Sequence, residues 1–459
     1  MIEGLRPYLE MADTGVAWLP SAPRGWATLR AKYVFQEVDH RSLDGQETHL
    51  SMHQKLGLVP SADSGEKRLV SESYAGGKLV EPNDLVLNRL KAHLGVFAYA
   101  TRPGVISPDY TVLRPLPNAY VRYYEYLLKS PACRGELRTR TKGIVEGFWR
   151  LYTDDFYDIR LPVPPLDEQR LIVRFLDWHG AMTGKLIRAK RRLIALLNEQ
   201  KQSIIHRAVT RGLDPTAKLK LSGVDWLGDV PAHWEVRKLR SLFGRLGSGT
   251  TPSGDAYYGG GVPWVASGDL NNEQVSQTQK TVTPKAVAEV SSLRVYPKGS
   301  VIVAMYGATI GKTGILAMDA CTNQACFVMA DPNHNFSSIF CQLVLTAAKQ
   351  ALIEQSYGGG QPNINAEIVK SLKVPCPPSE EQSEIELFVK HEVEEVSKAS
   401  TLAAQEIALI QEFRARLIAD VVTGQLDVRA SKSGDGPLRC RTQVHLTLKT
   451  GLIVRHYRK

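Results

Sequence analysis

The chain has 459 residues, of which 43% are hydrophobic and 23% are charged, and its formal net charge at pH 7 is +10. This composition is ordinary for a soluble globular protein, the length predicts about three domains, and the mildly basic balance permits nucleic-acid binding. No apolar run approaches the roughly 20 residues of a membrane span, no signal peptide pattern begins the chain, and the six cysteines show no zinc-ligand spacing, so we expect a cytoplasmic protein with free thiols.

Residues 1–165 are predicted to form a first mixed α/β domain. Residues 82–87 indicate a turn leading into a buried strand, 122–128 a helix and 159–163 a last strand. Its loops carry polar groups of the kinds that recognise base edges and phosphates, which predicts a DNA-binding set. This set comprises Asn88, Arg89, Lys91, His93, Arg102 and Lys142.

Residues 166–214 are predicted to form a long helix. A Pro-Pro step precedes the helix and presets its first turn, Asp167 can cap it, and Gly212 with Pro215 indicate where it stops. About 44 helical residues at 1.5 Å each give a rod of about 65 Å, a length typical of coiled coils. The segment holds ten basic and five acidic residues.

Residues 215–378 repeat the plan of the first domain. Trp18-Leu19, Trp26 and Phe35 reappear as Trp226-Leu227, Trp234 and Phe243, 208 residues later. A helix is expected over 339–352 and a last strand over 372–375. The predicted DNA-binding residues of this second domain are Tyr258, Asn271, Asn272, Tyr306, Thr309, Lys312, Gln361 and Asn363.

The segment Gly307–Thr313 resembles a phosphate-binding P-loop, but it has one residue too few between its glycines. Gly314 follows it instead of a helix-forming run. We therefore expect a tight glycine turn between two strands at this position. A nucleotide-dependent enzyme that uses this loop is the remote alternative.

Residues 379–428 are predicted to form a second long helix that repeats the first at an offset of 213. The opening Pro164–Gln169 returns as Pro377–Gln382, and 14 of the 49 positions from 166 to 214 are identical. An internal duplication of this kind predicts two similar domains. Four basic and eleven acidic residues give the second copy the opposite net charge, which favours antiparallel pairing of the two helices with the domains at opposite ends. The alternative is that each helix packs only on the domain before it.

The polar residues repeated at the two helix openings, together with the apolar heptad positions, predict contacts between the helices and with partner subunits. These residues are Glu168, Gln169, Phe175, Leu176, Leu197, Ile204, Glu381, Gln382, Phe388, Val389, Val396, Ile410 and Leu417.

Residues 429–459 hold eight basic residues and one acidic residue and are predicted as a basic extension, open to disorder. We find no sequence motif for a nucleophile, a metal site or a dinucleotide site, so no catalysis is expected from this chain alone.

Two variable domains, each followed by a long helix that opens Pro-Pro-x-(Asp/Glu)-Glu-Gln, resemble the specificity subunits of type I restriction-modification systems. The resemblance covers residues from about 15 to 428. Its supporting motifs are Trp226–Pro231 with His233-Trp234, Tyr306–Lys312, Thr322–Ala325, and the Thr-x-x-Leu-Asp ends at Thr210–Asp214 and Thr423–Asp427. The first domain departs from this pattern at Leu94-Gly95 and Ser107–Asp109, so the two domains should recognise different sequences.

The resemblance implies an α+β fold in which two target recognition domains are joined by two long antiparallel helices with pseudo-two-fold symmetry. Each domain would bind one half of a split, asymmetric sequence in double-stranded DNA. Two modification (methyltransferase) subunits would bind this chain, bring S-adenosylmethionine and methylate adenine. A restriction subunit that uses ATP and Mg could join them. The alternative is a stand-alone DNA-binding regulator with two domains, which would need no methyltransferase.

Overall fold

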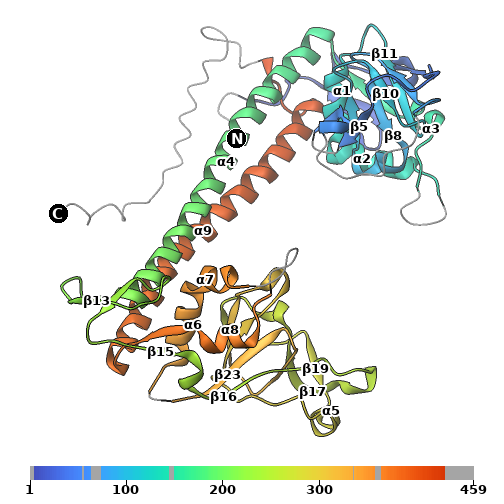
Figure 1. The fold of residues 1–459 in the computed structure, drawn as a ribbon. Helices are drawn as coiled ribbons and strands as arrows, with labels where there is room; N and C mark the ends of the chain where they lie inside the picture. Colours follow the sequence, from blue (N-terminus) through green and yellow to red (C-terminus); the bar gives the residue numbers. More distant parts are fainter. Residues whose placement is uncertain are drawn as a thin grey trace. The chain divides into compact units, whose positions relative to one another are not determined.

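The computed structural model describes residues 5–53, 56–63, 74–143, 149–333, 335–356 and 363–429. The chain forms two compact units (Figure 1). Unit 1 contains Met1–Arg188 and Glu406–Lys459, and unit 2 contains Ala189–Gln405. The α+β class with two similar domains and two long helices, predicted from the sequence, is confirmed. The basic extension beyond Arg429 lies outside the described residues.

Unit 1 contains a four-stranded antiparallel sheet with the order β4-β11-β8-β9. The pairs β1-β2, β3-β12, β5-β6 and β7-β10 surround it. The strands are β1 (Met11–Val16), β2 (Leu19–Pro23), β3 (Ala27–Arg30), β4 (Phe35–Val38), β5 (Leu50–His53), β6 (Gly57–Pro60), β7 (Lys78–Val80), β8 (Leu85–Asn88), β9 (Phe97–Tyr99), β10 (Gly104–Ile106), β11 (Tyr110–Pro115) and β12 (Arg160–Val163). The short helices are α1 (Val121–Lys129), α2 (Pro131–Arg140) and α3 (Thr153–Tyr157), with 3-10 turns η1 (Ala31–Tyr33), η2 (Ser61–Asp63) and η3 (Arg89–Leu94).

Unit 2 contains a five-stranded sheet with the order β16-β23-β20-β21-β18, in which β18 and β21 are parallel. The strands are β13 (Leu219–Leu221), β14 (Asp229–Pro231), β15 (Glu235–Lys238), β16 (Phe243–Ser248), β17 (Tyr258–Val265), β18 (Glu273–Val275), β19 (Lys280–Val282), β20 (Val301–Ala304), β21 (Thr313–Leu316), β22 (Cys321–Thr322), β23 (Cys326–Pro332) and β24 (Lys373–Cys376). The helices are α5 (Pro284–Glu289), α6 (Ser338–Ala347), α7 (Lys349–Glu354) and α8 (Ala366–Ser371), with η4 (Leu239–Ser241), η5 (Asp255–Tyr257), η6 (Ser267–Asp269) and η7 (Gly307–Thr309). The single helix expected over 339–352 is therefore two helices, which meet at Ala348.

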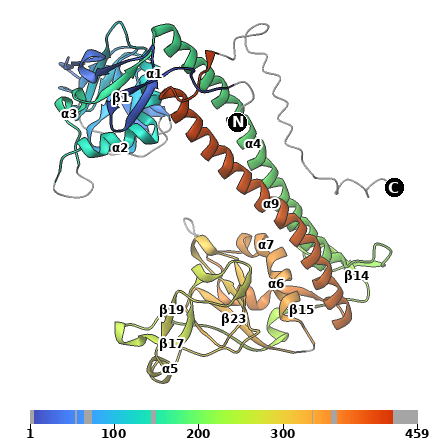
Figure 2. The same ribbon diagram turned by 180° about the vertical axis from the view of Figure 1, so that it is seen from behind.

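The long helices are α4 (Leu166–Arg211) and α9 (Ser379–Val422), with 46 and 44 residues. In unit 1 the start of α4 lies alongside the end of α9 in both views (Figures 1 and 2). The ring centroids of His179 and Phe413 are 5.9 Å apart, and a Cβ on Gly180 would lie 3.2 Å from Nη2 of Arg414. The two helices are antiparallel there, and Gly180 lets the Arg414 side chain approach the α4 backbone.

The main hydrophobic core of each unit includes buried residues from both long helices. In unit 1, Phe35 and Tyr124 share a core with Phe175 of α4 and Val421 of α9. In unit 2, the corresponding core joins Trp234 and Phe340 of the globular part to Val209 of α4 and Val389 of α9. Because α9 ends in the core of unit 1, the alternative that each helix packs only on the preceding domain is wrong.

A glycine ends each long helix at a close contact with the globular part of its unit. Gly212 follows α4 with a φ of 70°, and Gly424 follows α9 with a φ of 74°. A Cβ on Gly424 would lie 2.3 Å from Cδ of Pro23, and one on Gly212 would lie 3.1 Å from Cζ2 of Trp234. Left-handed backbone and the absence of a Cβ are both properties of glycine, so these positions favour no other residue.

We predict that Gly424→Ala destabilises unit 1. The left-handed conformation costs a residue with a Cβ about 1–2 kcal/mol, and the clash with Pro23 adds to this, so Tm should fall by about 4–8 °C. Calorimetry of the full chain measures the effect. Gly228→Ala is the matched control, because Gly228 has a φ of 61° and open space around it. Equal losses from the two variants would show that the close contact contributes nothing.

Candidate nucleic-acid interface

Asn88 and Arg89 lie where β8 passes into η3. Oδ1 of Asn88 accepts hydrogen bonds from the backbone N–H groups of Leu90 and Lys91, both at 3.2 Å, and so fixes the turn. Nε of Arg89 donates to Oγ1 of Thr111 at 2.8 Å, and its Nη2 lies 3.8 Å from Oε1 of Glu37. The sequence-predicted pair is therefore held in defined orientations by neighbouring strands.

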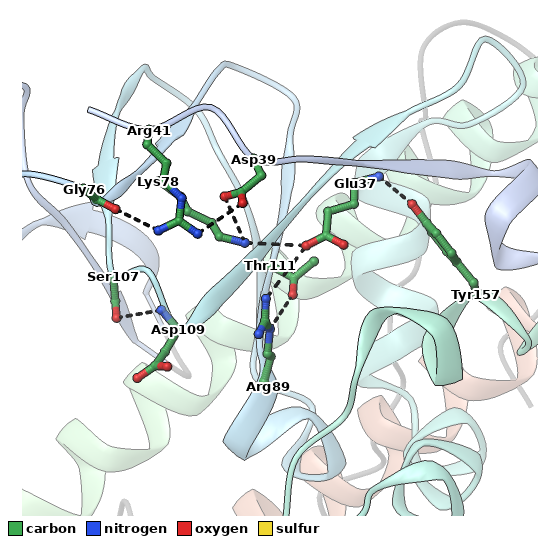
Figure 3. A network of polar contacts seen from close by, with 10 residues as sticks. All are labelled: Glu37, Asp39, Arg41, Gly76, Lys78, Arg89, Ser107, Asp109, Thr111 and Tyr157. Atoms are coloured by element: carbon green, nitrogen blue, oxygen red, sulfur yellow. Dashed lines mark hydrogen bonds and ion pairs between the residues drawn. The ribbon is translucent and has the colours of Figure 1, made fainter. Parts of the chain in front are cut away.

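Arg89 is one end of a chain of alternating charges on unit 1, which we call the charged network (Figure 3). Nζ of Lys78 lies 3.5 Å from Oε1 of Glu37 and 3.4 Å from Oδ1 of Asp39. Nη2 of Arg41 donates to Asp39 at 3.1 Å, and Nη1 of Arg41 donates to the carbonyl of Gly76 at 3.1 Å. The charged network consists of Glu37, Asp39, Arg41, Lys78 and Arg89.

The electrostatics of the charged network depend on Lys78, whose side chain is only 2% exposed. A buried ammonium must be paired, and Lys78 is paired with two carboxylates. Burial alone would raise the pKa of Asp39, but the hydrogen bond from Arg41 and the charge of Lys78 outweigh it and lower that pKa. Three cations and two carboxylates leave this surface with one excess positive charge.

Sequence reasoning missed four members of the charged network. Lys78 is far from Glu37, Asp39 and Arg41 along the chain, and no motif joins them. A signal was nevertheless present, because alternate residues of an extended segment project to the same side. The spacing Glu37-x-Asp39-x-Arg41 therefore predicts a charged face along the end of β4 and the residues after it.

The other predicted residues of unit 1 differ in whether their polar side chains are free to bind DNA. Lys91 and Arg102 are exposed. The His93 ring meets Trp149 edge-on at 5.7 Å, and burial together with the charges of nearby arginines lowers its pKa, so the ring is neutral near pH 7. Nζ of Lys142 lies 2.7 Å from Oδ1 of Asp155, which ties this cation to its own unit.

In unit 2, the predicted asparagines support the backbone. Asn272 has a φ of 67°, and its Oδ1 accepts a hydrogen bond from the backbone N–H of Thr313 at 2.9 Å. Oδ1 of the exposed Asn271 accepts from the backbone N–H of Glu273 at 3.2 Å. Tyr258 donates its hydroxyl proton to the carbonyl of Pro252 at 3.0 Å. The acceptor oxygens of both asparagines are thus already engaged.

The remaining predicted residues of unit 2 gather at the loop between β20 and β21. Tyr306, Thr309 and Lys312 belong to this loop, and Asn363 forms a β-bridge with Tyr306. Gln361 lies outside the described residues. The antiparallel strand β21 follows the loop, as expected for a glycine turn and unlike the helix that follows a P-loop.

The repeated helix openings bind the globular part of their own unit. Gln169 is fully buried: its Oε1 accepts from the backbone N–H of Tyr120 at 2.7 Å, and its Nε2 donates to the carbonyls of Asn118 and Pro164 at 2.9 and 2.8 Å. Gln382 repeats this pattern. Its Oε1 accepts from the N–H of Ser337 at 2.8 Å, and its Nε2 donates to the carbonyl of Pro377 at 2.9 Å.

The adjacent glutamates bind different partners in the two units. Glu381 accepts from Nε2 of His233 at 2.6 Å and from Nε1 of Trp234 at 2.7 Å. Glu168 accepts from the hydroxyl of Tyr8, whose pKa is raised by burial and by this bond. The helix openings therefore have an anchoring role within the chain, and a role in binding partner subunits stays a prediction.

The apolar residues predicted for helix contacts differ in how far they are buried. Phe175, Leu176, Val389, Val396 and Leu417 are buried, Leu197, Ile204 and Ile410 are half-buried, and Phe388 is 42% exposed. Both long helices also carry large apolar side chains that face solvent, which we call the exposed apolar set. In unit 1 the set is Met182, Leu186, Leu409 and Phe413, and in unit 2 it is Leu193, Leu196, Leu387, Phe388 and Leu402.

Two classes of site are missing from the part of the chain that the structure describes. No group of three or more His, Cys, Asp or Glu side chains in that part could hold a metal ion. None of its helices has the length and apolar character needed to cross a membrane.

Residues 63–195 and 231–394 match the family model of the type I restriction modification DNA specificity domain. These two ranges make up more than half of the chain. The chain belongs to this family. The specificity-subunit resemblance predicted from the sequence is thereby confirmed, and the matched ranges of this family member include Lys78, Arg89 and both buried glutamines.

Individual relatives of this specificity protein agree with the family match. It is 30% identical over 165 residues to the MjaIX specificity subunit of Methanocaldococcus jannaschii, a match that covers 35% of this chain and 38% of that one. It is 22% identical over 301 residues to the MjaVIII specificity subunit of the same organism, covering 64% and 68%. A chain in a structure on complex assembly and conformational transition of the type I R-M system shares the fold, with a TM-score of 0.67, 15% identity, and coverage of 87% and 98%.

We predict that Gln382→Ala destabilises unit 2 of this specificity protein. The substitution leaves the N–H of Ser337 and the carbonyl of Pro377 without their side-chain partner, and each buried polar group left unpaired costs about 1–3 kcal/mol. Denaturation of the full chain by urea measures the change. Gln350→Ala is the control, because Gln350 is exposed and bonds only Glu354 at 3.0 Å. A Gln382 variant as stable as this control would contradict the anchoring role.

Proposed function

We propose that this specificity protein binds a split DNA sequence, with unit 1 and unit 2 each recognising one half. The observation that supports this is that the two units share one sheet order but carry different side chains at equivalent positions. The sheet order β4-β11-β8-β9 of unit 1 corresponds to β16-β23-β20-β21 of unit 2. Yet the position of Glu37 on β4 is taken by Arg245 on β16, and the position of Arg89 is taken by the buried Ala304.

The backbone correspondence makes this comparison specific. Phe35 and Phe243 begin their strands and pair with Pro115 and Pro332, the last residues of β11 and β23. Counting two residues onward from each phenylalanine gives Glu37 and Arg245. Different side chains at equivalent points of one scaffold are what two different half-sites require, since the side chains that touch base edges determine sequence preference.

We propose that the exposed apolar set binds two modification subunits, one copy for each half-site. Clusters of large apolar side chains on the surface of a soluble protein mark interaction sites. Leu409 is 63% exposed and Leu387 is 69% exposed, although both lie on long helices whose other faces are buried. The partner would supply S-adenosylmethionine and the adenine methylation step, and a restriction subunit with ATP and Mg could complete the complex.

In this proposal the chain itself performs no covalent step and works beside cellular DNA in the cytoplasm. Its contribution is to hold base-recognising side chains in fixed positions and to bring the methyltransferase to them. The thiols of Cys133 and Cys341 are buried, and burial raises the pKa of both above their ordinary value. Protonated thiols of this kind are poor nucleophiles, in keeping with a recognition role.

The function is tested by expressing the chain with its methyltransferase partner and sequencing the DNA by a method that detects N6-methyladenine. The expected result is one new methylated motif with two short specific halves and an unread gap of constant length. A complex that assembles and methylates DNA without sequence preference would contradict the recognition role. Sequence-specific DNA binding by the chain alone, with no complex formed, would favour the two-domain regulator instead.

We further propose that the length of the long helices fixes the gap between the half-sites. Helix α4 begins in the core of unit 1 and ends in the core of unit 2, and α9 does the reverse. A helix anchored at both ends in this way resists changes in its length. One helix length would then permit one half-site spacing.

Inserting one heptad into each helix, after Arg188 in α4 and after Gln405 in α9, should widen the methylated gap. Seven residues add about 10 Å of helix, which corresponds to about three base pairs at 3.4 Å each, and a heptad preserves the 3.5-residue period of the contacts. Methylation sequencing reports the gap directly. The same heptad inserted after Pro215, outside the helices, should leave the gap unchanged, and an unchanged gap in the helix variant would contradict the spacing role.

A further inference from the structure

The guanidinium of Arg89 is held along one edge. Its Nε and Nη2 form the side edge of the planar group, and this edge faces Thr111 and Glu37, at 2.8 and 3.8 Å. Among the residues that the structure describes, Nη1 of Arg89 has no hydrogen-bond partner. The end edge, formed by Nη1 and Nη2, therefore keeps its parallel N–H donors, and the side chain is 27% exposed.

Arg41 uses its guanidinium in the opposite way. Its Nη1 donates to the carbonyl of Gly76 and its Nη2 to Asp39, both at 3.1 Å, so its end edge is occupied within the protein. Arg41 thus closes one end of the charged network. Arg89, at the other end, retains the edge that can form two parallel hydrogen bonds with one partner.

The charged network holds Arg89 through Glu37 (Figure 3). The backbone N–H of Glu37 donates to the hydroxyl of Tyr157 at 2.6 Å. Oε1 of Glu37 lies 3.5 Å from Nζ of the buried Lys78. Lys78 also offsets the charge of Glu37 and Asp39, which would otherwise repel the phosphates of DNA. An arginine fixed before binding loses less conformational entropy when it forms its contacts.

Unit 2 has no equivalent of this arrangement at the corresponding positions. Pro82–Leu87 aligns with Pro297–Ile302, which places Ala304 where unit 1 has Arg89. Arg245 replaces Glu37, and its Nε pairs with Asp331 across the sheet at 2.5 Å. The arrangement of unit 1 is therefore not repeated at these described positions of unit 2, which predicts a chemical difference between the two half-sites.

We propose that Arg89 is a specificity-determining residue that recognises one guanine in the half-site of unit 1. Its end edge matches O6 and N7 of guanine in the major groove, the commonest specific pairing between arginine and DNA. Lys78 and Glu37 are positioning residues that hold the side edge and leave the donors of the end edge for the base. This assignment rests on the proposed function, because it needs unit 1 to bind DNA.

The first test compares Arg89→Lys with the original chain in the methylation experiment. Lysine keeps the charge but lacks the planar fork, so discrimination at one guanine in one half of the motif should fall by about 10- to 100-fold. The other half should stay unchanged. Arg24→Lys, at an exposed arginine that pairs with Glu10, is the matched control and should alter neither half. A motif that Arg89→Lys leaves intact would overturn the assignment.

A second measurement uses the original complex, so it does not depend on the folding of a variant. Each guanine of the motif is replaced in turn by 7-deazaguanine, which lacks the N7 acceptor, and DNA affinity is measured by competition. We expect one guanine, in one half, at which affinity falls by about tenfold or more. Affinity that no replacement lowers would overturn the assignment of Arg89, whereas a motif absent from the original complex would overturn the proposed function itself.

The positioning role of Lys78 has a separate readout. Lys78→Met should relax the motif at the same guanine as Arg89→Lys, while Lys78→Arg, which keeps the cation, should retain it. A purely structural role would lower Tm and the total methylation without changing the preferred base. Loss of methylation at all motif variants alike would therefore contradict positioning.

Discussion

The architecture depends on how each long helix is fixed at its two ends. At the start, the buried amides of Gln169 and Gln382 take over backbone groups that the preceding segments leave unpaired. At the end, a glycine in left-handed conformation lets Pro23 or Trp234 close on the last turn. Buried polar groups without partners are costly, so these contacts specify one position of the helix relative to its unit. The globular part of each unit shares a core with these helix ends, so the same contacts also fix the position of the helices against the globular residues.

The parts of the fold that could be predicted are those encoded locally or by repetition. The Pro-Pro steps, the glycines after the helices and the apolar spacing are short-range signals. The Pro-Pro steps repeat at an offset of 213, and a glycine follows each helix. The helix over 339–352 is the exception, because it breaks at the buried Ala348 and no glycine or proline marks the break in the sequence. Residue type alone could not predict which polar side chains are already hydrogen-bonded within the protein. Asn272 has the chemistry of a base-recognising residue, yet its oxygen holds Thr313.

The charged network shows what sequence patterns cannot supply. Lys78 comes close to Glu37 and Asp39 only because β7 lies near the end of β4 in the folded domain. Its nearly complete burial distinguishes it from the exposed Lys91 of the same unit. Unit 2 keeps the same sheet order without this network, so the scaffold does not require it.

Each unit contains a junction between the end of a long helix and the globular part. The junction is one continuous segment in unit 2 and two separate segments in unit 1. In unit 2 the backbone runs unbroken from the end of α4 through β13 and β14 to Trp234. In unit 1 the same place is filled by two separate stretches, where the backbone N–H of Asp427 donates to the carbonyl of Arg6 at 2.8 Å. Folding therefore brings the residues near 6 and 427 into backbone contact. Two segments distant in the sequence thus supply in unit 1 the junction that one continuous segment supplies in unit 2, so in unit 1 the contact between the residues near 6 and 427 has to form by folding.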